Sequence, residues 1–299
     1  MRIVVTGREG QVARSLRERG AAAGVEILPL ARPEIDLARP HSIQAPLSAL
    51  RPDAVVNAAA YTAVDRAESE REQAFAINAT GAGAVAAAAA ALGVPVIHLS
   101  TDYVFDGALD RPYVESDMPN PMTAYGQSKL DGERMVAAAQ PDHAILRTAW
   151  VYSPFGKNFV RTMLALAAQR AEISIVGDQH GSPTGALDIA DAILAVARRM
   201  IERPGTVELR GVFHLAGDGE ASWAELAEAI FDESRAVGGP SARVIPIPSS
   251  AYPTPARRPA NSRLNGDRMQ AVFGVRLPPW RPSLSACVRR LVREGGAPA

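Results

Sequence analysis

The N-terminal segment places the strongest constraint on how this chain can fold. The apolar run Ile3-Val4-Val5 is typical of a buried strand, and it leads into Thr6-Gly7-Arg8-Glu9-Gly10-Gln11-Val12-Ala13 and a helical pattern. Gly7 permits a tight turn, Gly10 lets backbone approach a pyrophosphate, and the small Ala13 permits close packing of helix on strand. The N–H groups at the start of the helix would then face the phosphates. The spacing is G-x-x-G-x-x-A rather than G-x-G-x-x-G, and a glycine turn without nucleotide is the alternative. Its position after an apolar strand at the chain start favours dinucleotide binding.

Further apolar segments recur along the chain with helical patterns between most of them. They are Val25-Glu26-Ile27-Leu28, Ala54-Val55-Val56, Val96-Ile97-His98-Leu99, Ala144-Ile145-Leu146 and Val212-Phe213-His214-Leu215. Strands separated by helices need crossover connections and therefore pair in parallel. The stretch from Gly81 to Leu99 is interrupted by Gly93 and Pro95, so it predicts a helix followed by a strand rather than a membrane span. The expected fold class is α/β, a Rossmann-like doubly wound parallel sheet.

The regular alternation weakens after Trp150, which indicates a second unit. The segment 240–282 is dense in Pro, Arg and Ser, but its interspersed apolar residues argue against a disordered tail; these are Val244, Ile245, Ile247, Leu264, Val272, Phe273 and Trp280. We expect a dinucleotide-binding domain over residues 1–150, to which the chain returns near 186–217. Residues 151–185 and 218–299 would form a smaller C-terminal substrate-binding lobe.

The run Ala124-Tyr125-Gly126-Gln127-Ser128-Lys129 carries the chemical signal. Residues four apart lie on one face of a helix, so the Lys129 ammonium can lower the pKa of the Tyr125 phenol by favouring the phenolate. Such a tyrosine can exchange a proton near neutrality. The pattern alone also fits a solvated amphipathic helix. Its combination with the N-terminal glycine turn is what favours an active site.

Composition narrows the classes of partner. With 32 basic and 32 acidic residues the formal net charge is zero, so no broad field favours nucleic acid or an anionic membrane. Cys287 is the only cysteine, which excludes an internal disulfide framework and a thiolate-rich metal site. The strand reaches glycine by position 7, so the first residues lack the pattern of a signal peptide. A cytoplasmic location is the expectation.

Several segments together resemble the extended short-chain dehydrogenase/reductases and, within them, the dTDP-4-dehydrorhamnose reductase family. The resemblance covers most of the chain, and the Ser-Thr-Asp-Tyr-Val-Phe-Asp-Gly run is its most specific part. The matching segments are Gly7–Val12, Asn57–Glu68, Ser100–Gly107, Tyr125–Lys129, Arg147–Tyr152, Asp178–Gly185 and Arg257–Ser262.

This resemblance implies hydride transfer from NADPH, or NADH, to the C4 ketone of dTDP-4-dehydro-L-rhamnose, the last step of dTDP-rhamnose biosynthesis. Tyr125 would be the general acid, and Lys129 would hold the cofactor ribose and support the ionised tyrosine. Thr101, just beyond a strand, would aim its hydroxyl at the ketone oxygen, where negative charge grows. The residues implied to contact substrate are Thr101, Asp102, Trp150, Gln179 and Arg258.

The same residues have structural interpretations. Thr101 could satisfy backbone groups at a strand end, and Asp102 could cap the next turn. Tyr103 and Phe105 fit packing better than ligand contact. His98, inside an apolar strand, fits a satisfied core histidine. No His or acidic spacing predicts a metal, although some family members are thought to use a divalent ion at a subunit contact, so metal dependence and the choice between monomer and homodimer stay open.

The cofactor set follows partly from position and partly from resemblance. Besides Tyr125 and Lys129 it comprises Gly7, Gly10, Gln11, Val12, Arg32, Asp36, Leu37, Ala60, Tyr61 and Thr62. Arg32 stands in the loop after the second strand, where an acid would bind the ribose 2′-hydroxyl, and its planar fork suits a 2′-phosphate. This favours NADPH, with an ordinary surface charge as the alternative.

Two other functions compete with reduction. A nucleotide-sugar epimerase or dehydratase of the same superfamily would need extra acid or base groups near Thr101, and Asp102 lacks the adjacent glutamate expected of a dehydratase. A non-catalytic NADP-binding subunit, resembling the regulatory subunit of methionine adenosyltransferase, is the alternative outside catalysis. The joint presence of Thr101, Tyr125 and Lys129 argues against it.

Overall fold

A six-stranded parallel sheet forms the centre of the molecule in the computed structural model, which describes residues 1–295. The strand order is β10-β5-β4-β3-β1-β2. The bounds are β1 Arg2–Thr6, β2 Glu26–Leu30, β3 Ala54–Asn57, β4 Val96–Thr101, β5 His143–Thr148 and β10 Gly211–His214. Each of the six apolar segments named from the sequence overlaps one of these strands, so the expected fold class is confirmed.

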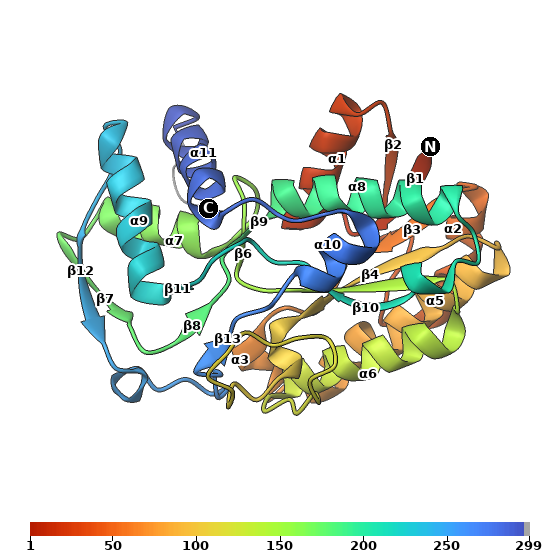
Figure 1. The fold of residues 1–299 in the computed structure, drawn as a ribbon, viewed down its shortest axis with the longest axis horizontal. Helices are drawn as coiled ribbons and strands as arrows, with labels where there is room; N and C mark the ends of the chain where they lie inside the picture. Colours follow the sequence, from red (N-terminus) through yellow and green to blue (C-terminus); the bar gives the residue numbers. More distant parts are fainter. Residues whose placement is uncertain (296–299) are drawn as a thin grey trace.

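Helices cover both faces of the sheet (Figure 1). Helices α1 Gln11–Ala22 and α8 Ala186–Glu202 lie on one face, and α5 Ala82–Ala91 and α6 Ala124–Ala139 lie on the other. Ile3 and Val5 contribute to the core under α1 and α8, whereas Val4 contributes to the opposite core. This alternation is the period of a strand buried on both faces, where each large apolar side chain contributes roughly 1.5–3 kcal/mol.

The direction in which successive strands are added to the sheet reverses at β1, which places the ligand site. Strand β1 pairs with β2 on one side and with β3 on the other, so the connections that follow β1 and β2 lead to opposite sides of β1. A crevice opens at the carboxyl ends of the strands at such a switch point. The glycine turn follows β1 at this position, and Thr101 ends β4, which is separated from β1 by β3.

One continuous helical run is strongly apolar. Helix α4 Arg71–Phe75, a π-helical turn Ala76–Gly81 and α5 form the continuous run Arg71–Ala91, which by length and composition alone could cross a membrane. Of its most apolar window, 56% is buried inside the fold. The expected helix followed by a strand between Gly81 and Leu99 is confirmed.

A second hydrophobic core lies at the other end of the molecule, on the left of Figure 1. It is formed by α7 Phe159–Ala167, α9 Trp223–Ala236 and α11 Trp280–Arg293, with β7 Glu172–Val176 paired to β12 Arg243–Ile247. A capping box starts α9, because Ser222 accepts from the Glu225 N–H while the Glu225 side chain accepts from the Ser222 N–H.

Short two-residue strands join segments that are far apart in sequence. Strand β6 Val151–Tyr152 pairs with β9 Thr184–Gly185, and β8 His180–Gly181 lies between β11 Ala221–Ser222 and β13 Asn261–Ser262. Helix α10 Asp267–Phe273 falls in the range expected for the lobe, yet its Met269 and Phe273 pack into the first core. The remaining helices are α2 Gln44–Ala49, α3 Val64–Ala67 and the 3₁₀ turns Pro40–Ser42, Asp102–Val104, Val207–Leu209 and Ser249–Ala251.

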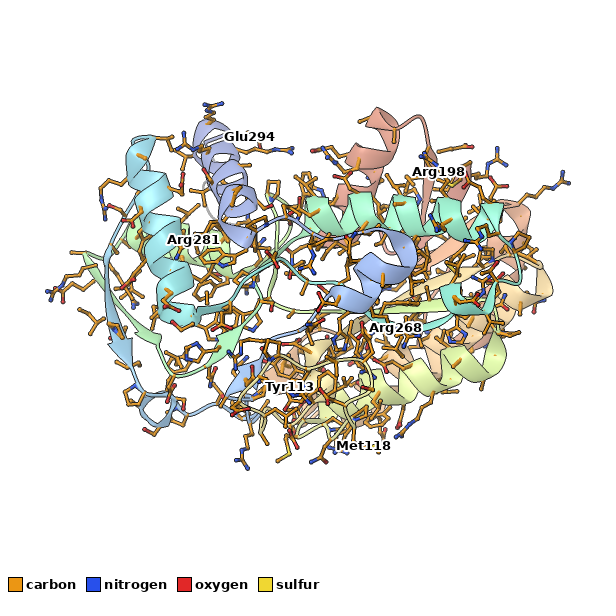
Figure 2. The ribbon with its side chains drawn as sticks, viewed as in Figure 1. Tyr113, Met118, Arg198, Arg268, Arg281 and Glu294 are labelled. Atoms are coloured by element: carbon orange, nitrogen blue, oxygen red, sulfur yellow. The ribbon has the colours of Figure 1, made fainter. Side chains whose placement is uncertain are left out.

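The loop between β4 and α6 carries Tyr113 and Met118 (Figure 2). Tyr113 stacks on Phe105 with a centroid distance of 4.1 Å and forms an isolated bridge to Leu264. Met118 is 85% exposed. The inner side of this loop is thereby attached to the chain segment that follows β13.

Candidate active site

A cavity of about 630 Å³ opens at the carboxyl ends of β1, β3 and β4. Its size is in the range of small-molecule and cofactor sites. Thr101, Tyr125 and Lys129 all line it. The other predicted site residues that line it are Gly7, Gly10, Gln11, Val12, Ala60, Thr62, Asp102 and Trp150.

The glycine turn has the geometry that a diphosphate requires. Gly7 has φ +94°, a backbone conformation that L side chains rarely adopt. Gly10 is the N-cap of α1, no side chain caps this helix end, and no atom lies within 4 Å of the position that a Cβ on Gly10 would take. The open helix N-terminus facing the cavity therefore fits the diphosphate of a dinucleotide.

The loop after β3 is held by hydrogen bonds from two directions. Thr6 Oγ1 accepts from the Ala58 and Ala59 N–H groups, at 3.1 and 3.0 Å. Asn78, in the π-helical turn, accepts from the Tyr61 N–H and donates to the Tyr61 carbonyl. The Tyr61 phenol donates to Glu70 Oε2 at 2.5 Å. Ala60 and Thr62 thus line the cavity, while the Tyr61 side chain is hydrogen-bonded to Glu70, the residue that precedes α4.

Tyr125 lies in the first turn of α6, which is fixed at its start. Thr123 Oγ1 accepts from the Gly126 N–H at 3.0 Å, and Glu68 Oε1 accepts from the Ala124 N–H at 2.9 Å. Burial raises the pKa of the Tyr125 phenol. The sequence argument expected a lowered pKa from the Lys129 ammonium. That expectation is wrong for this structure, because burial is the dominant cause.

Lys129 is 2% exposed, and it turns toward strand β4. Its Nζ donates to the Leu99 carbonyl at 2.6 Å and lies 3.4 Å from His98 Nε2. Burial lowers the pKa of Lys129 to about 8, while the negative charge of Glu133 acts in the opposite direction. The amine that the sequence argument placed beside the phenol is therefore bound to the backbone of β4 here, and its proton is held less tightly than usual.

Thr101 and Asp102 form a buried pair at the end of β4. Thr101 Oγ1 donates to Asp102 Oδ1 at 2.8 Å and accepts from the Tyr103 N–H at 3.2 Å. Thr101 thus caps the 3₁₀ turn, a role that the structural interpretation had given to Asp102, while it also lines the cavity. Its hydroxyl hydrogen is directed to Asp102 rather than into open space. Burial raises the pKa of the Asp102 carboxyl to about 6, and the Thr101 hydrogen bond opposes the rise.

Trp150 packs against the second hydrophobic core and against the small cluster that contains Phe105 and Tyr113. Its ring stacks on Trp223 with a centroid distance of 3.5 Å, and its Nε1 donates to Ser262 Oγ at 3.0 Å. Its backbone has φ +47°, which is rare for a bulky residue and clusters at functional sites. A Cβ on Gly181 would lie 2.3 Å from the Trp150 ring, so this stack needs glycine at 181.

Gln179 and Arg258 line two other cavities, of about 550 and 600 Å³, rather than the main one. Arg258 Nη2 lies 2.7 Å from Asp65 Oδ2, and its Nη1 donates to the Tyr103 hydroxyl at 3.4 Å. Tyr103 lines the main cavity. The Arg258 guanidinium therefore reaches the boundary of the main cavity through Tyr103.

Arg32, Asp36 and Leu37 lie outside the residues that line the main cavity. Arg32 is exposed beyond the end of β2. Asp36 Oδ1 accepts from the Ala38 N–H at 3.0 Å, so this carboxylate stabilises its own turn. Leu37 is 8% exposed and packs in the core beneath α5.

Tyr103 and Lys157 are among the lining residues that were not identified as site residues from the sequence. Tyr103 was interpreted as packing, although it follows Thr101 by two positions and shares the cavity. Lys157 was overlooked, yet Lys129 and Lys157 are the only two lysines of the chain and both line this cavity. The rarity of lysine beside so many arginines was a usable signal. No group of three or more His, Cys, Asp or Glu side chains in residues 1–295 is arranged to hold a metal ion.

Comparison with known proteins finds relatives over the whole chain. The family described as "RmlD substrate binding domain" matches residues 1–293. A dTDP-4-dehydrorhamnose reductase from Sinorhizobium fredii is 52% identical over 99% of both chains. A reductase of that name from Clostridium acetobutylicum has a solved structure at TM-score 0.89 and 35% identity, covering 98% of this chain and 100% of that one. The Bacillus anthracis reductase, solved in complex with NADP, is similar at TM-score 0.87 and 34% identity, over 96% and 98% of the two chains.

Proposed function

The chain belongs to the dTDP-4-dehydrorhamnose reductase family, and from this premise we propose that it reduces the C4 ketone of dTDP-4-dehydro-L-rhamnose to dTDP-L-rhamnose. The reductant is NADPH or NADH, and the reaction is the last step of dTDP-rhamnose biosynthesis. The observation that carries the proposal is the shared cavity of Thr101, Tyr125 and Lys129 beside the Gly7–Gly10 turn.

Tyr125 is the general acid of the proposed reaction. When bound, the reduced nicotinamide cofactor supplies the hydride that adds to the ketone carbon. Tyr125 then donates its phenolic proton to the ketone oxygen as negative charge develops there. The raised pKa of the phenol keeps it protonated before reaction, which is the form that an acid must have.

Lys129 and Thr101 both support this transfer. The Lys129 ammonium stabilises the phenolate that remains and also holds hydroxyl groups of the cofactor ribose. Thr101 lines the same cavity as Tyr125, and its hydroxyl hydrogen, now donated to Asp102, can turn to the developing oxyanion. Such positioned donors act strongly because the surrounding residues exclude water.

The substrate side combines Trp150 with groups from the lobe. The Trp150 ring forms an apolar wall for the sugar, and Gln179 and Arg258 supply polar contacts to the nucleotide part. Arg258 suits a diphosphate because its planar guanidinium can donate two parallel hydrogen bonds. It now pairs with Asp65, so binding there would exchange one anion for another.

NADPH is the favoured reductant on the basis of local charge. Arg32, exposed beyond the end of β2, can pair with a 2′-phosphate, which NADH lacks. Lys157 lines the cavity, where its charge would help to bind either cofactor. Gln11 and Val12 would present backbone N–H groups to the diphosphate, and Asp36 and Leu37 would border the adenine. We place this reaction in the cytoplasm and expect a monomer or homodimer that binds a nucleotide-sugar.

Mixing the purified protein with NADPH and dTDP-4-dehydro-L-rhamnose tests the proposal. We expect the absorbance of the reduced cofactor to fall in step with the formation of dTDP-L-rhamnose. An epimerase or dehydratase would convert sugar without net oxidation of added NADPH, and a regulatory subunit would bind NADPH without any turnover. Either result would reject the reductase.

A further inference from the structure

A buried chain of polar side chains runs behind the cavity, from β1 to the catalytic lysine. Thr6 at the end of β1, Asn57 at the end of β3, His98 in β4 and Lys129 on α6 are each at most 2% exposed. Thr6 Oγ1 lies 2.6 Å from Asn57 Oδ1, Asn57 Nδ2 lies 3.0 Å from His98 Nδ1, and His98 Nε2 lies 3.4 Å from Lys129 Nζ. The proposed reaction uses only the last of these four groups.

The direction of the first hydrogen bond is fixed by the backbone. A threonine hydroxyl has one hydrogen to donate and two lone pairs. Both lone pairs of Thr6 Oγ1 accept backbone hydrogens, from Ala58 and Ala59. The Thr6 hydrogen must therefore go to Asn57, which requires the amide oxygen of Asn57 to face Thr6.

That amide orientation fixes the tautomer of His98. With its oxygen toward Thr6, Asn57 presents its NH₂ group to His98 Nδ1, which must accept. A neutral imidazole then carries its hydrogen on Nε2. Burial and the charge of Lys129 both lower the pKa of His98 well below its ordinary value of 6.5, so the neutral form persists. His98 Nε2–H consequently points toward Lys129 Nζ, and an ammonium there has no lone pair to accept it.

The charged groups around Lys129 come from two elements besides β4. Glu133, one turn further along α6, forms a buried ion pair with Arg147 of β5 at 2.7 Å, and it also accepts from Ser100 Oγ. Its charge is thus shared with Arg147. His143 on β5 is paired with Val96, two residues before His98, and its charge would also lower the pKa of His98.

We propose that Thr6 and Asn57 fix the Nε2–H tautomer of His98, making His98 a positioning residue that presents a donor to Lys129 and weakens its hold on a proton. The lysine hydrogens are then directed to the Leu99 carbonyl and toward the cavity. This row of hydrogen-bonded side chains orients its members and does not conduct protons, since the Asn57 amide cannot relay one. The role of Lys129 in turnover rests on the proposed function, whereas the tautomer and proton affinity are properties of the folded chain.

NMR of the intact protein tests the tautomer directly. With five histidines and two lysines in the sequence, selective ¹⁵N labelling gives few signals, and Lys157 serves as the reference lysine in the same spectrum. We expect His98 to show a protonated Nε2 and an unprotonated Nδ1 at pH values on both sides of 6.5. A protonated Nδ1, or an imidazolium at neutral pH, would overturn the proposal. This measurement needs no variant and no substrate.

Two variants separate positioning from core packing. In Asn57→Asp the carboxylate can only accept, so His98 should switch to Nδ1–H and offer a lone pair to Lys129. The titration of Lys129 should then move up by roughly one pH unit, the worth of a charge-assisted hydrogen bond. Thr6→Val removes the hydroxyl that orients the Asn57 amide and adds no charge. His98 should then populate both tautomers, and the titration of Lys129 should move in the same direction by a smaller amount. An unmoved Lys129 titration despite a switched tautomer would refute the coupling.

Conservative and control variants complete the test. His98→Gln can accept from Asn57 through its oxygen and present its NH₂ to Lys129, so the lysine titration should stay near the wild-type value. His143→Gln on the neighbouring strand should also leave it unmoved. In Asn57→Asp the alkaline limb of kcat/KM should shift together with the Lys129 signal. If the wild type does not oxidise NADPH at all, the proposed function fails while the spectra still decide the tautomer.

Discussion

The two sides of the active-site cavity are built in different ways. On the cofactor side, the glycine turn, the Ala58–Thr62 loop and Thr101 each follow one strand of a single parallel sheet. On the substrate side, Trp150, Gly181 and Ser262 meet through two-residue strands and side-chain contacts that join segments more than 80 positions apart. The geometry of the cofactor side is set by a regular sheet, whereas that of the substrate side depends on individual long-range contacts.

This difference has a physical consequence. Positions on the cofactor side are supported by a continuous backbone ladder and two-sided cores, so a single side-chain change there should alter chemistry more than folding. The substrate side rests on close contacts such as the Trp150–Trp223 stack and the approach of Gly181 to Trp150. A single side-chain change on the substrate side should therefore alter the free energy of unfolding more than the chemistry.

The largest expected effect is catalytic and lies on the cofactor side. Tyr125→Phe removes the general acid but keeps the ring, so kcat should fall by roughly 10²–10⁴-fold. The free energy of unfolding and the affinity for NADPH should stay close to wild type. Stopped-flow absorbance and NADPH titration measure the two quantities. A variant with unchanged kcat would remove Tyr125 from the mechanism.

The next effect lies where the two sides meet, at Asp102. Folding raises the pKa of this carboxyl from 3.8 to about 6, so its neutral form stabilises the fold fully below 3.8, and that stability is lost as pH rises through 6. Asp102→Asn stays neutral at every pH. Its free energy of unfolding should therefore exceed that of wild type by up to about 3 kcal/mol near pH 8, and the advantage should shrink toward pH 4. Denaturant unfolding at the two pH values checks this, and a difference independent of pH would contradict it.

On the substrate side, Gly181→Ala tests whether close contacts carry the stability. The added methyl group would lie 2.3 Å from the Trp150 ring, so one of the two must move. We expect a loss of about 1–3 kcal/mol in unfolding free energy, with the Trp150–Trp223 stack disturbed in fluorescence. Gly266→Ala is the matched control, because a Cβ there meets nothing closer than 3.9 Å. Equal stability of the two variants would remove the contrast between the sides.

The smallest effect is expected at Arg32, on the exposed edge of the cofactor side. Arg32→Ala should weaken NADPH binding by a few fold and leave NADH binding unchanged, since a solvent-exposed ion pair contributes only about 0.2–1 kcal/mol. Lys157→Gln offers the comparison within the cavity, because loss of its charge should weaken both cofactors. Equal losses for the two cofactors in Arg32→Ala would place the 2′-phosphate contact elsewhere.

The same contrast explains what could be predicted from sequence. The six sheet strands and the placement of Gly7, Tyr125 and Lys129 at one site follow from local periodicity and spacing, together with the rule that ligands bind beyond the carboxyl ends of strands. Thr101 also lies beyond a strand end, but its place in the site was implied by the family resemblance. The pairing of β8 with β11 and β13 could not be predicted, because two-residue strands carry no periodic signal. For the same reason, the separate cavities of Gln179 and Arg258 were not foreseen.

The hydrogen bonds and pKa values of the site residues were predicted less well than which residues line the cavity. The Tyr-x-x-x-Lys spacing correctly placed both side chains at one cavity, but it could not say that Lys129 would donate to the Leu99 carbonyl or that burial would raise the phenol pKa. Those facts depend on desolvation by residues from other strands. His98 was correctly expected in the core, and its contact with Lys129 was visible only once β4 and α6 were packed together.

The most direct test of the central claim is to follow the hydride itself. NADPH carrying deuterium at the transferred position of its nicotinamide C4 should give dTDP-L-rhamnose with deuterium at the sugar C4 and nowhere else. The oxygen at that carbon would take its hydrogen from Tyr125 and finally from solvent. Deuterium retained by the cofactor, or found at another carbon of the sugar, would contradict reduction in this cavity.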